Sequence, residues 1–191
     1  MPHEGVPFHY CATCDGALYK DKVVAVIGGG NVAFTEALYL SKICKRVEIV
    51  MCDQLITAEP AEVKRVNNTK NIYISMDYPV ERVEKFANGY GLVRKGFDPM
   101  SSANLLVDGI FIAIGMIPEK CPWDKAELTL HGYVLANEWG RTRMPGDKII
   151  VDYGFYAAGD ARSKRLKQSI TAAADGANCV ASVLHYLEKK F

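Results

Sequence analysis

Cys11 and Cys14 are separated by only two residues, and Asp15 follows directly. A thiol pair at this spacing can close a small ring. One thiolate can then attack a partner disulfide, and the second thiol can resolve the mixed disulfide. Asp15 is placed to exchange the proton that this chemistry gains or loses. The motif therefore predicts a redox-active disulfide between Cys11 and Cys14.

A structural zinc site is the main alternative for a cysteine pair, and it requires two further ligands at short spacing. His3 and His9 are the only histidines near one another. The remaining cysteines are isolated in the sequence, at Cys44, Cys52, Cys121 and Cys179. We therefore expect no metal site and four reduced thiols beside the pair.

The apolar run 22–27 leads into a glycine-rich loop, which opens an amphipathic stretch over 31–43. The pattern Gly28-x-Gly30-x-x-Ala33 in a strand–loop–helix context is the dinucleotide fingerprint. Gly28 permits the tight turn, Gly30 lets the backbone approach a pyrophosphate, and Ala33 replaces the third glycine at the helix–strand contact. A glycine-rich turn without a ligand is the alternative, and the surrounding pattern favours nucleotide binding.

The helix that begins at Asn31 offers free N–H groups and a partial positive charge to a phosphate. A ribose-contacting carboxylate is expected roughly 20 residues past such a loop. Asp53 lies near that place, and the next basic residue is Lys64. A carboxylate favours a free 2′-hydroxyl and repels a 2′-phosphate, so this arrangement argues against NADP. Alternatively, Asp53 is simply a solvated loop residue.

Strands and helices alternate around these residues, which predicts an α/β fold with a Rossmann-like parallel sheet. Asn88-Gly89 lies between two alternating stretches and predicts a β-hairpin within a meander. The terminal stretch 167–190 has helical periodicity, and 147–160 is expected to be extended. Strands are predicted over 22–27, 46–51, 71–76, 108–115 and 133–136, and helices over 31–43 and 58–68.

The overall composition is that of an ordinary core-forming protein: of 191 residues, 49% are apolar and 24% are charged. A net charge of +1 gives no electrostatic reason to expect a nucleic-acid partner. No apolar run approaches the roughly 18 residues that span a bilayer, and the N-terminus does not resemble a signal peptide. We expect a cytoplasmic protein that does not bind membranes.

Residues 10–43 resemble the pyridine-nucleotide domain of the low-molecular-weight flavoprotein thioredoxin reductases. The stretches 154–160 (GFYAAGD) and 167–182 (KQSITAAADGANCVAS) are similar to the C-terminal FAD-binding segment of that family. The resemblance implies that residues 1–140 are a pyridine-nucleotide-binding-like domain carrying the redox pair. It implies that residues 141–191 are the C-terminal segment of an FAD-binding domain.

Members of this family pass electrons from a nicotinamide through FAD to the cysteine pair and on to thioredoxin. By resemblance, Cys14 faces the flavin, Cys11 attacks thioredoxin or a similar dithiol protein, and Asp15 is the acid. The resemblance also implies flavin contacts in the C-terminal segment. These are Gly159 and Asp160 at the ribityl or phosphate end, and Lys167, Gln168 and Ser169 near the isoalloxazine.

The sequence departs from the family where its NADPH users grip the 2′-phosphate. Those members carry a His-Arg-Arg run and a further arginine, whereas this chain has Met51-Cys52-Asp53 and Thr57. The change places NADPH use in doubt and leaves NAD(H) or NADP(H) open. A dithiol oxidase, or a reductase fed by a donor other than NADPH, is therefore an alternative function.

The family also begins with an FAD-binding unit that has its own Gly-x-Gly-x-x-Gly, which this sequence lacks. We expect the chain to be either a fragment or a natural remnant that holds FAD weakly, and a non-catalytic nucleotide-binding remnant is a further alternative. The last helix would then expose an apolar face that either a homodimer or the chain's own sheet could cover. The residues of that face are Ile170, Ala174, Val180, Leu184 and Leu187.

Overall fold

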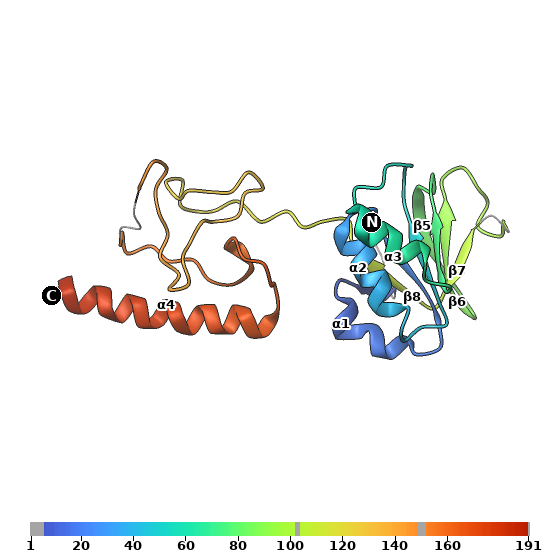
Figure 1. Cartoon of the computed structure of the whole chain (residues 1–191), viewed down its shortest axis with the longest axis horizontal. Helices are drawn as coiled ribbons and strands as arrows, with labels where there is room; N and C mark the ends of the chain where they lie inside the picture. The colour runs from blue at the N-terminus through green and yellow to red at the C-terminus, as the bar shows by residue number, and fades with distance from the viewer. Residues whose placement is uncertain (1–5, 102–103, 149–151, 191) are drawn as a thin grey trace. The chain divides into compact units, whose positions relative to one another are not determined.

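The computed structural model describes residues 6–101, 104–148 and 152–190. The chain divides into two compact units, with the boundary in the sequence between Gly115 and Met116 (Figure 1). The sequence places the boundary between functional domains further on, between residues 140 and 141. Residues 116–140 share a small core with the segment after them, which is why the compact units divide earlier. The assignment of functional domains stays a prediction.

The first unit is built on a five-stranded sheet in the order β1-β8-β2-β3-β4, in which all neighbouring strands are parallel. The central strand β2 is buried on both faces, with Val24, Ala25 and Val26 fully inaccessible to solvent. Its run of β-branched residues explains this position, since parallel strands are covered on both sides. The strands are β1 (Phe8–His9), β2 (Val23–Ile27), β3 (Arg46–Val50), β4 (Ile72–Ser75) and β8 (Gly109–Ile112).

Helices cover one face of this sheet. Ala33 and Phe34 of α2, the longest helix of this unit, pack against Val24 and Val26 of β2 in the larger of the unit's two apolar clusters. Pro60 opens α3, where its missing N–H costs no hydrogen bond. The elements on this side are α1 (Ala12–Asp15), the 3-10 turn η1 (Gly16–Tyr19), α2 (Asn31–Leu40) and α3 (Pro60–Asn67).

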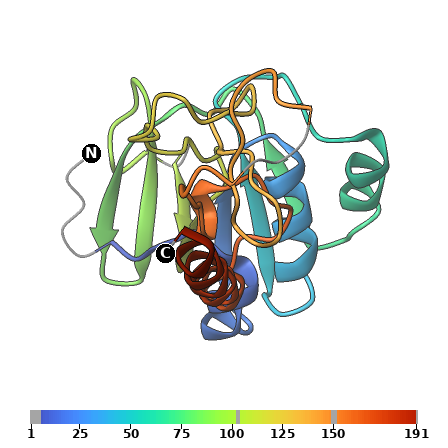
Figure 2. The same ribbon diagram turned by 90° about the vertical axis from the view of Figure 1, so that its left-hand side faces the viewer.

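An antiparallel sheet covers the other face, and the two views in Figures 1 and 2 place α2 and this second sheet on opposite sides of the parallel sheet. Ala25 of β2 packs here with Leu92 and Val107. The predicted hairpin joins the first two strands, and Gly89 has a φ of +139° in its turn. The strands are β5 (Val80–Phe86), β6 (Gly89–Arg94) and β7 (Leu105–Val107).

The second unit contains one long helix, α4 (Ser169–Lys190), a 3-10 turn η2 (Gly159–Ala161) and irregular segments. The strand expected over 133–136 is reduced to isolated bridges, in which Val134 pairs with Leu128 and Arg162. No neighbouring segment in the described residues 116–148 and 152–190 runs beside it for long enough to form a ladder. Of the expected extended stretch 147–160, residues 149–151 lie outside the described residues, and Tyr156 forms a single bridge with Arg141.

A buried ionic cluster holds the second unit together. The Oδ2 atom of Asp175 accepts hydrogen bonds from Lys164 Nζ at 2.9 Å and from the Gly159 N–H at 3.0 Å, and it lies 3.4 Å from Arg162 Nε. Burial opposes the charge on Asp175, but the bonds and cations outweigh this and hold the pKa of its carboxyl below the usual value. The turn before α4 is therefore fixed to the helix by charge.

The predicted α/β fold class is confirmed, with small differences at the ends of elements. The helix expected over 31–43 ends at Leu40, because the N–H groups of Lys42 and Ile43 bond to carbonyls only three residues back. The strand expected over 108–115 ends at Ile112. Such differences arise where tertiary contacts close an element before its local pattern ends.

Candidate functional site: a disulfide turn and a glycine loop

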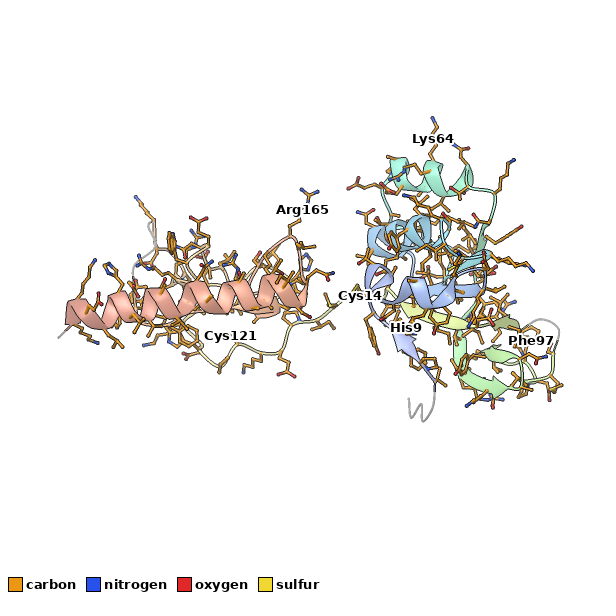
Figure 3. All side chains as sticks on the ribbon, turned by 90° about the horizontal axis from the view of Figure 1, so that it is seen from below. His9, Cys14, Lys64, Phe97, Cys121 and Arg165 are labelled. Carbon is orange, nitrogen blue, oxygen red and sulfur yellow. A yellow bond between two sulfur atoms is a disulfide. The ribbon has the colours of Figure 1, made fainter. Side chains whose placement is uncertain are left out.

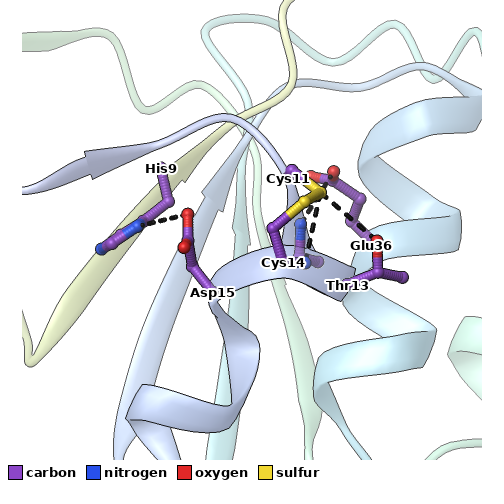
Figure 4. The surroundings of a disulfide bond; sticks show 7 residues. His9, Cys11, Thr13, Cys14, Asp15 and Glu36 are labelled. Carbon is purple, nitrogen blue, oxygen red and sulfur yellow. Dashed lines mark hydrogen bonds and ion pairs between the residues drawn. A yellow bond between two sulfur atoms is a disulfide. The ribbon is translucent and has the colours of Figure 1, made fainter. Parts of the chain in front are cut away.

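Cys11 and Cys14 form a disulfide at the start of α1, with their Cα atoms 5.3 Å apart (Figure 4). Cys11 occupies the N-cap position, and its Sγ accepts the Cys14 N–H at 3.2 Å. Thr13 Oγ1 lies 3.3 Å from the same sulfur. Cys14 is exposed and Cys11 is partly buried. These donors would stabilise negative charge on the Cys11 sulfur after reduction.

Glu36 joins this turn to α2. Its Oε1 accepts the Ala12 N–H at 3.2 Å, although the two residues lie 24 positions apart (Figure 4). Burial raises the pKa of the Glu36 carboxyl, and the bond from Ala12 opposes only part of this shift. Oε2 is buried and has no hydrogen-bond partner among the described residues. The redox turn is therefore attached to the helix that the glycine loop opens.

Asp15 is paired with a histidine that the sequence analysis considered only as a metal ligand. His9 Nδ1 lies 2.9 Å from Asp15 Oδ2, and His9 Nε2 lies 2.7 Å from Tyr19 Oη. His9 ends strand β1, which directly precedes the redox turn in the sequence and pairs in parallel with β8. His3, the other histidine of that analysis, lies outside the described residues. The only signal for His9 in the sequence is its place two residues before Cys11.

The glycine loop has the close contacts that its fingerprint requires. Gly28 has a φ of +145°, and a Cβ there would lie 2.3 Å from the carbonyl oxygen of Ala113. A Cβ on Gly29 would lie 2.7 Å from the Met51 side chain. Gly30 is the N-cap of α2, with no side-chain cap, and Ala33 is fully buried against the sheet. The backbone leaves no room for a side chain at Gly28, as the tight turn of the fingerprint requires, whereas a Cβ on Gly30 would meet only Thr57 Oγ1, at 3.4 Å.

A cavity of about 540 Å³ opens beside this loop at the carboxyl ends of β2, β3 and β8. Its lining is mainly apolar and aromatic, and Asp53 is the only charged residue among the described residues that line it. Asp53 Oδ1 accepts the Leu55 N–H at 3.0 Å. Lys64 lies on α3, exposed, with its side chain pointing outward (Figure 3). Ligands of open α/β sheets bind at such strand ends.

The flavin-contact residues expected from the sequence lie in the second unit, beside a separate cavity of about 520 Å³. Asp160 and Lys167 line it. Lys167 Nζ donates to the Asp160 carbonyl oxygen at 2.7 Å and lies 3.8 Å from the centre of the Tyr133 ring. Burial lowers the pKa of Lys167. The other three residues are not among those that line the cavity: Gly159 lies in η2, Gln168 just before α4 and Ser169 at its first position.

The described residues contain no group of three or more His, Cys, Asp or Glu side chains arranged to hold a metal ion. Within the same ranges, no helix is both long and apolar enough to cross a membrane.

A parallel sheet with a nucleotide-type glycine loop and a disulfide on the adjoining turn defines a class of dinucleotide-binding redox proteins. The family model for pyridine nucleotide-disulphide oxidoreductases matches residues 2–176. The chain belongs to this family.

Thioredoxin reductases are among the most similar relatives. The chain is 34% identical over 186 residues to the thioredoxin reductase of Helicobacter pylori, covering 93% of this chain and 57% of the relative. It is 32% identical to that of Bacillus subtilis, covering 94% and 55%. The crystal structure of thioredoxin reductase from Streptococcus pyogenes superposes with a TM-score of 0.80 at 28% identity, over 97% of this chain and 61% of that one. The chain spans about half the length of the curated relatives it matches.

Proposed function

We propose that the protein is a disulfide oxidoreductase of the thioredoxin reductase type. It passes electrons through a flavin to the Cys11–Cys14 pair and on to a dithiol protein such as thioredoxin. The observation that carries the proposal is the disulfide at the start of α1, beside Asp15 and tied through Glu36 to the glycine-loop helix. A structural disulfide would need none of these neighbours.

In the proposed exchange, the reduced Cys11 thiolate attacks one sulfur of the partner disulfide. A Cys11–partner disulfide forms, and the second partner sulfur leaves as a thiolate that takes a proton from Asp15. The Cys14 thiol gives its proton to Asp15 and attacks Cys11 Sγ. The intramolecular disulfide forms again, and Asp15 releases its proton to solvent while the remaining partner sulfur takes one up, so Asp15 returns to its ionised form. The partner gains two electrons and two protons.

FAD is the proposed carrier of electrons between a nicotinamide and the disulfide. The cavity of the second unit supports this assignment, because it combines an exposed carboxylate, Asp160, with the partly desolvated cation Lys167. Gly159 has a φ of +69°, which lets the backbone turn there without a side chain in the way. Asp160 and Gly159 would hold the ribityl or phosphate end, and Lys167, Gln168 and Ser169 would lie near the ring.

For the nicotinamide site, we propose that NADH binds at least as well as NADPH. Gly28, Gly30 and the helix N-terminus at Asn31 would hold the pyrophosphate, with Ala33 setting that helix against the sheet. Asp53 would accept a hydrogen bond from a free 2′-hydroxyl. No Lys or Arg is among the described residues that line the cavity. Each lost charge-assisted bond to a phosphate is worth about 1.5–3 kcal/mol, so a 2′-phosphate gains little here. The homodimer and the cytoplasmic location expected from the sequence also stay proposals.

Trapping variants test the dithiol function. After reduction with dithiothreitol and desalting, the Cys14→Ser chain should form a stable mixed disulfide with oxidised thioredoxin through Cys11. The Cys11→Ser chain should form little. Cys52→Ser, at an exposed cysteine outside the pair, is the matched control and should leave transfer from the intact pair unchanged. Trapping through any other cysteine, or none in either variant, would contradict the proposal.

Calorimetric titration tests the nucleotide preference. Asp53→Asn keeps an acceptor for the Leu55 N–H and removes the charge, so the ratio of NADPH to NADH affinity should rise severalfold. Asp98→Asn is the matched control, because Asp98 caps the Met100 N–H in the same way outside the cavity lining. Placing arginine at both Cys52 and Asp53 should recover more NADPH affinity. A tenfold preference of the unaltered chain for NADPH would refute the charge argument.

A further inference from the structure

The imidazole of His9 is held on all its polar and apolar sides. Nδ1 meets Asp15, Nε2 meets Tyr19, and the ring centre lies 5.1 Å from that of Phe111. Only 13% of the His9 side chain is exposed. Tyr19 is also buried, and it meets both other rings edge-on. A histidine fixed in this way presents one defined ring edge, the one with Nδ1, to the carboxylate.

The pattern of donors assigns a single tautomer. A neutral imidazole donates from one nitrogen and accepts at the other, and an ionised carboxylate only accepts. Nδ1 therefore carries the hydrogen toward Asp15, and the Tyr19 hydroxyl donates to Nε2. Burial raises the pKa of Tyr19, as do the nearby Tyr90, Asp15 and Asp108, so this hydroxyl keeps its proton.

We propose that His9 is the positioning residue for Asp15 in the dithiol exchange, an inference that rests on the proposed function. The Nδ1–H bond occupies Asp15 Oδ2 and orients the carboxylate (Figure 4). The other oxygen is left for the proton that passes to and from the sulfurs. Tyr19 acts one step further back, by keeping Nδ1 as the protonated nitrogen.

The ionisable groups that face the His9 imidazole are Asp15 from α1 and Tyr19 from η1. Around Tyr19 lie Tyr90 of β6, Asp108 just before β8, and Lys22, whose Nζ is 5.8 Å from the Tyr19 ring centre. Asp15 and Tyr19 are the two that bond to the imidazole directly.

The test follows the reduced chain as it reacts with a small dialkyl disulfide, whose basic leaving thiolate requires a proton, with the modified cysteines identified by mass spectrometry. All variants carry Cys52→Ser to remove the exposed thiol. His9→Phe keeps a ring against Phe111 and should slow the reaction of the pair at least about tenfold, since a placed acid contributes about 10²–10⁴-fold. His9→Asn keeps an N–H for Asp15 and should recover most of the rate.

Each result decides the proposal. Unchanged kinetics in His9→Phe would overturn it, as would an equally slow His9→Asn variant that folds normally. His185→Phe, at an exposed histidine of α4, is the matched control and should leave the rate unchanged. If the unaltered chain itself does not exchange through Cys11 and Cys14, the dithiol function fails rather than the role of His9.

Nitrogen NMR of the oxidised chain gives a second readout that a purely structural role would not move. At pH 8 the His9 signals should show a protonated Nδ1 and an unprotonated Nε2. Tyr19→Phe should convert part of the population to the other tautomer, and Asp15→Asn should do the same. A protonated Nε2 in the unaltered chain would overturn the proposal even if no His9 variant folds.

Discussion

The two units differ in what fills their interiors. In the first, large side chains such as Phe34, Phe111 and Ile49 are fully buried between the sheet and its covering layers. In the second, the buried apolar residues are small: Ala126, Val134 and Ala157 among the residues that the structure describes. Its large apolar side chains face outward instead, and Ile117, Leu130 and Ile170 are all more than 70% exposed.

This contrast shows that the two units of one chain can be stabilised in different ways. The first unit gains its stability from burial of β-branched and aromatic residues. The second depends on polar groups inside, such as Asp175 and Ser182, while α4 presents Val180 and Leu184 to solvent. Exposed apolar surface of this kind usually marks an interaction site. The pattern supports the proposal that the second unit is part of a larger FAD-binding domain.

The largest expected effect lies in the first unit. Phe34→Ala removes a fully buried ring and should lower the free energy of unfolding of that unit by about 3–5 kcal/mol. Far-ultraviolet circular dichroism in urea measures it. Phe97→Ala, at a ring that is 41% exposed, is the matched control and should change stability by no more than about 0.5 kcal/mol. Equal effects at both sites would contradict the burial argument.

The second expected effect lies in the second unit. Tryptophan fluorescence reports on this unit alone, because both tryptophans, Trp123 and Trp139, lie in it. Asp175→Asn leaves Lys164 and Arg162 without their shared carboxylate and should destabilise this unit by about 2–3 kcal/mol, followed by tryptophan fluorescence. Glu188→Gln, on the exposed end of the same helix, is the control.

The same carboxylate gives the second unit a defined pH dependence. Because its pKa in the folded state is lowered, its contribution to stability is complete above the ordinary value of about 4 and is lost as the pH falls below it. The tryptophan transition of the unaltered chain should therefore weaken at low pH more steeply than that of Asp175→Asn. Parallel pH profiles would show that the ionic cluster does not hold the unit.

The smallest expected effects compare two residues of α4 whose exposure is the reverse of the usual pattern, since the apolar Leu184 is exposed and the polar Ser182 is buried. Leu184→Ser removes a large apolar side chain that is 57% exposed and should change stability by no more than about 0.5 kcal/mol. Ser182→Ala, on the same helix, loses the buried hydroxyl that donates to the Trp139 carbonyl at 2.9 Å and should cost about 1 kcal/mol. If Leu184→Ser proves the more costly, the apolar face is covered in solution, and sedimentation would test for a second copy.

The sequence predicted those elements whose signal lies within a few neighbouring residues. The buried run of β2, the glycine loop and the Asn88-Gly89 hairpin each carry their own signal, and the structure has all three. The pairing of Cys11 with Cys14 was likewise readable from their spacing.

The site partners could not be predicted in this way, because they depend on contacts between distant residues. Glu36 reaches Ala12, 24 positions away, only once α2 has packed on the sheet. His9 is six residues from Asp15, but the ring that it packs against, Phe111, comes from the distant strand β8. The prediction of a short strand over 133–136 was wrong for a related reason. A strand needs a neighbouring strand to pair with, and the sequence pattern alone does not show whether one is present.

The loop after β3 carries a consequence for how such proteins diverge. Its position is set by main-chain bonds, from the Thr57 N–H to the Gly29 carbonyl at 3.0 Å and from the Tyr78 N–H to the Met51 carbonyl at 2.8 Å. Because these bonds ignore side-chain identity, exposed positions such as Cys52 can mutate at little cost to the architecture. Under the proposed function, a few substitutions in this loop would exchange one electron donor for another, while the glycine loop and the disulfide turn keep their geometry.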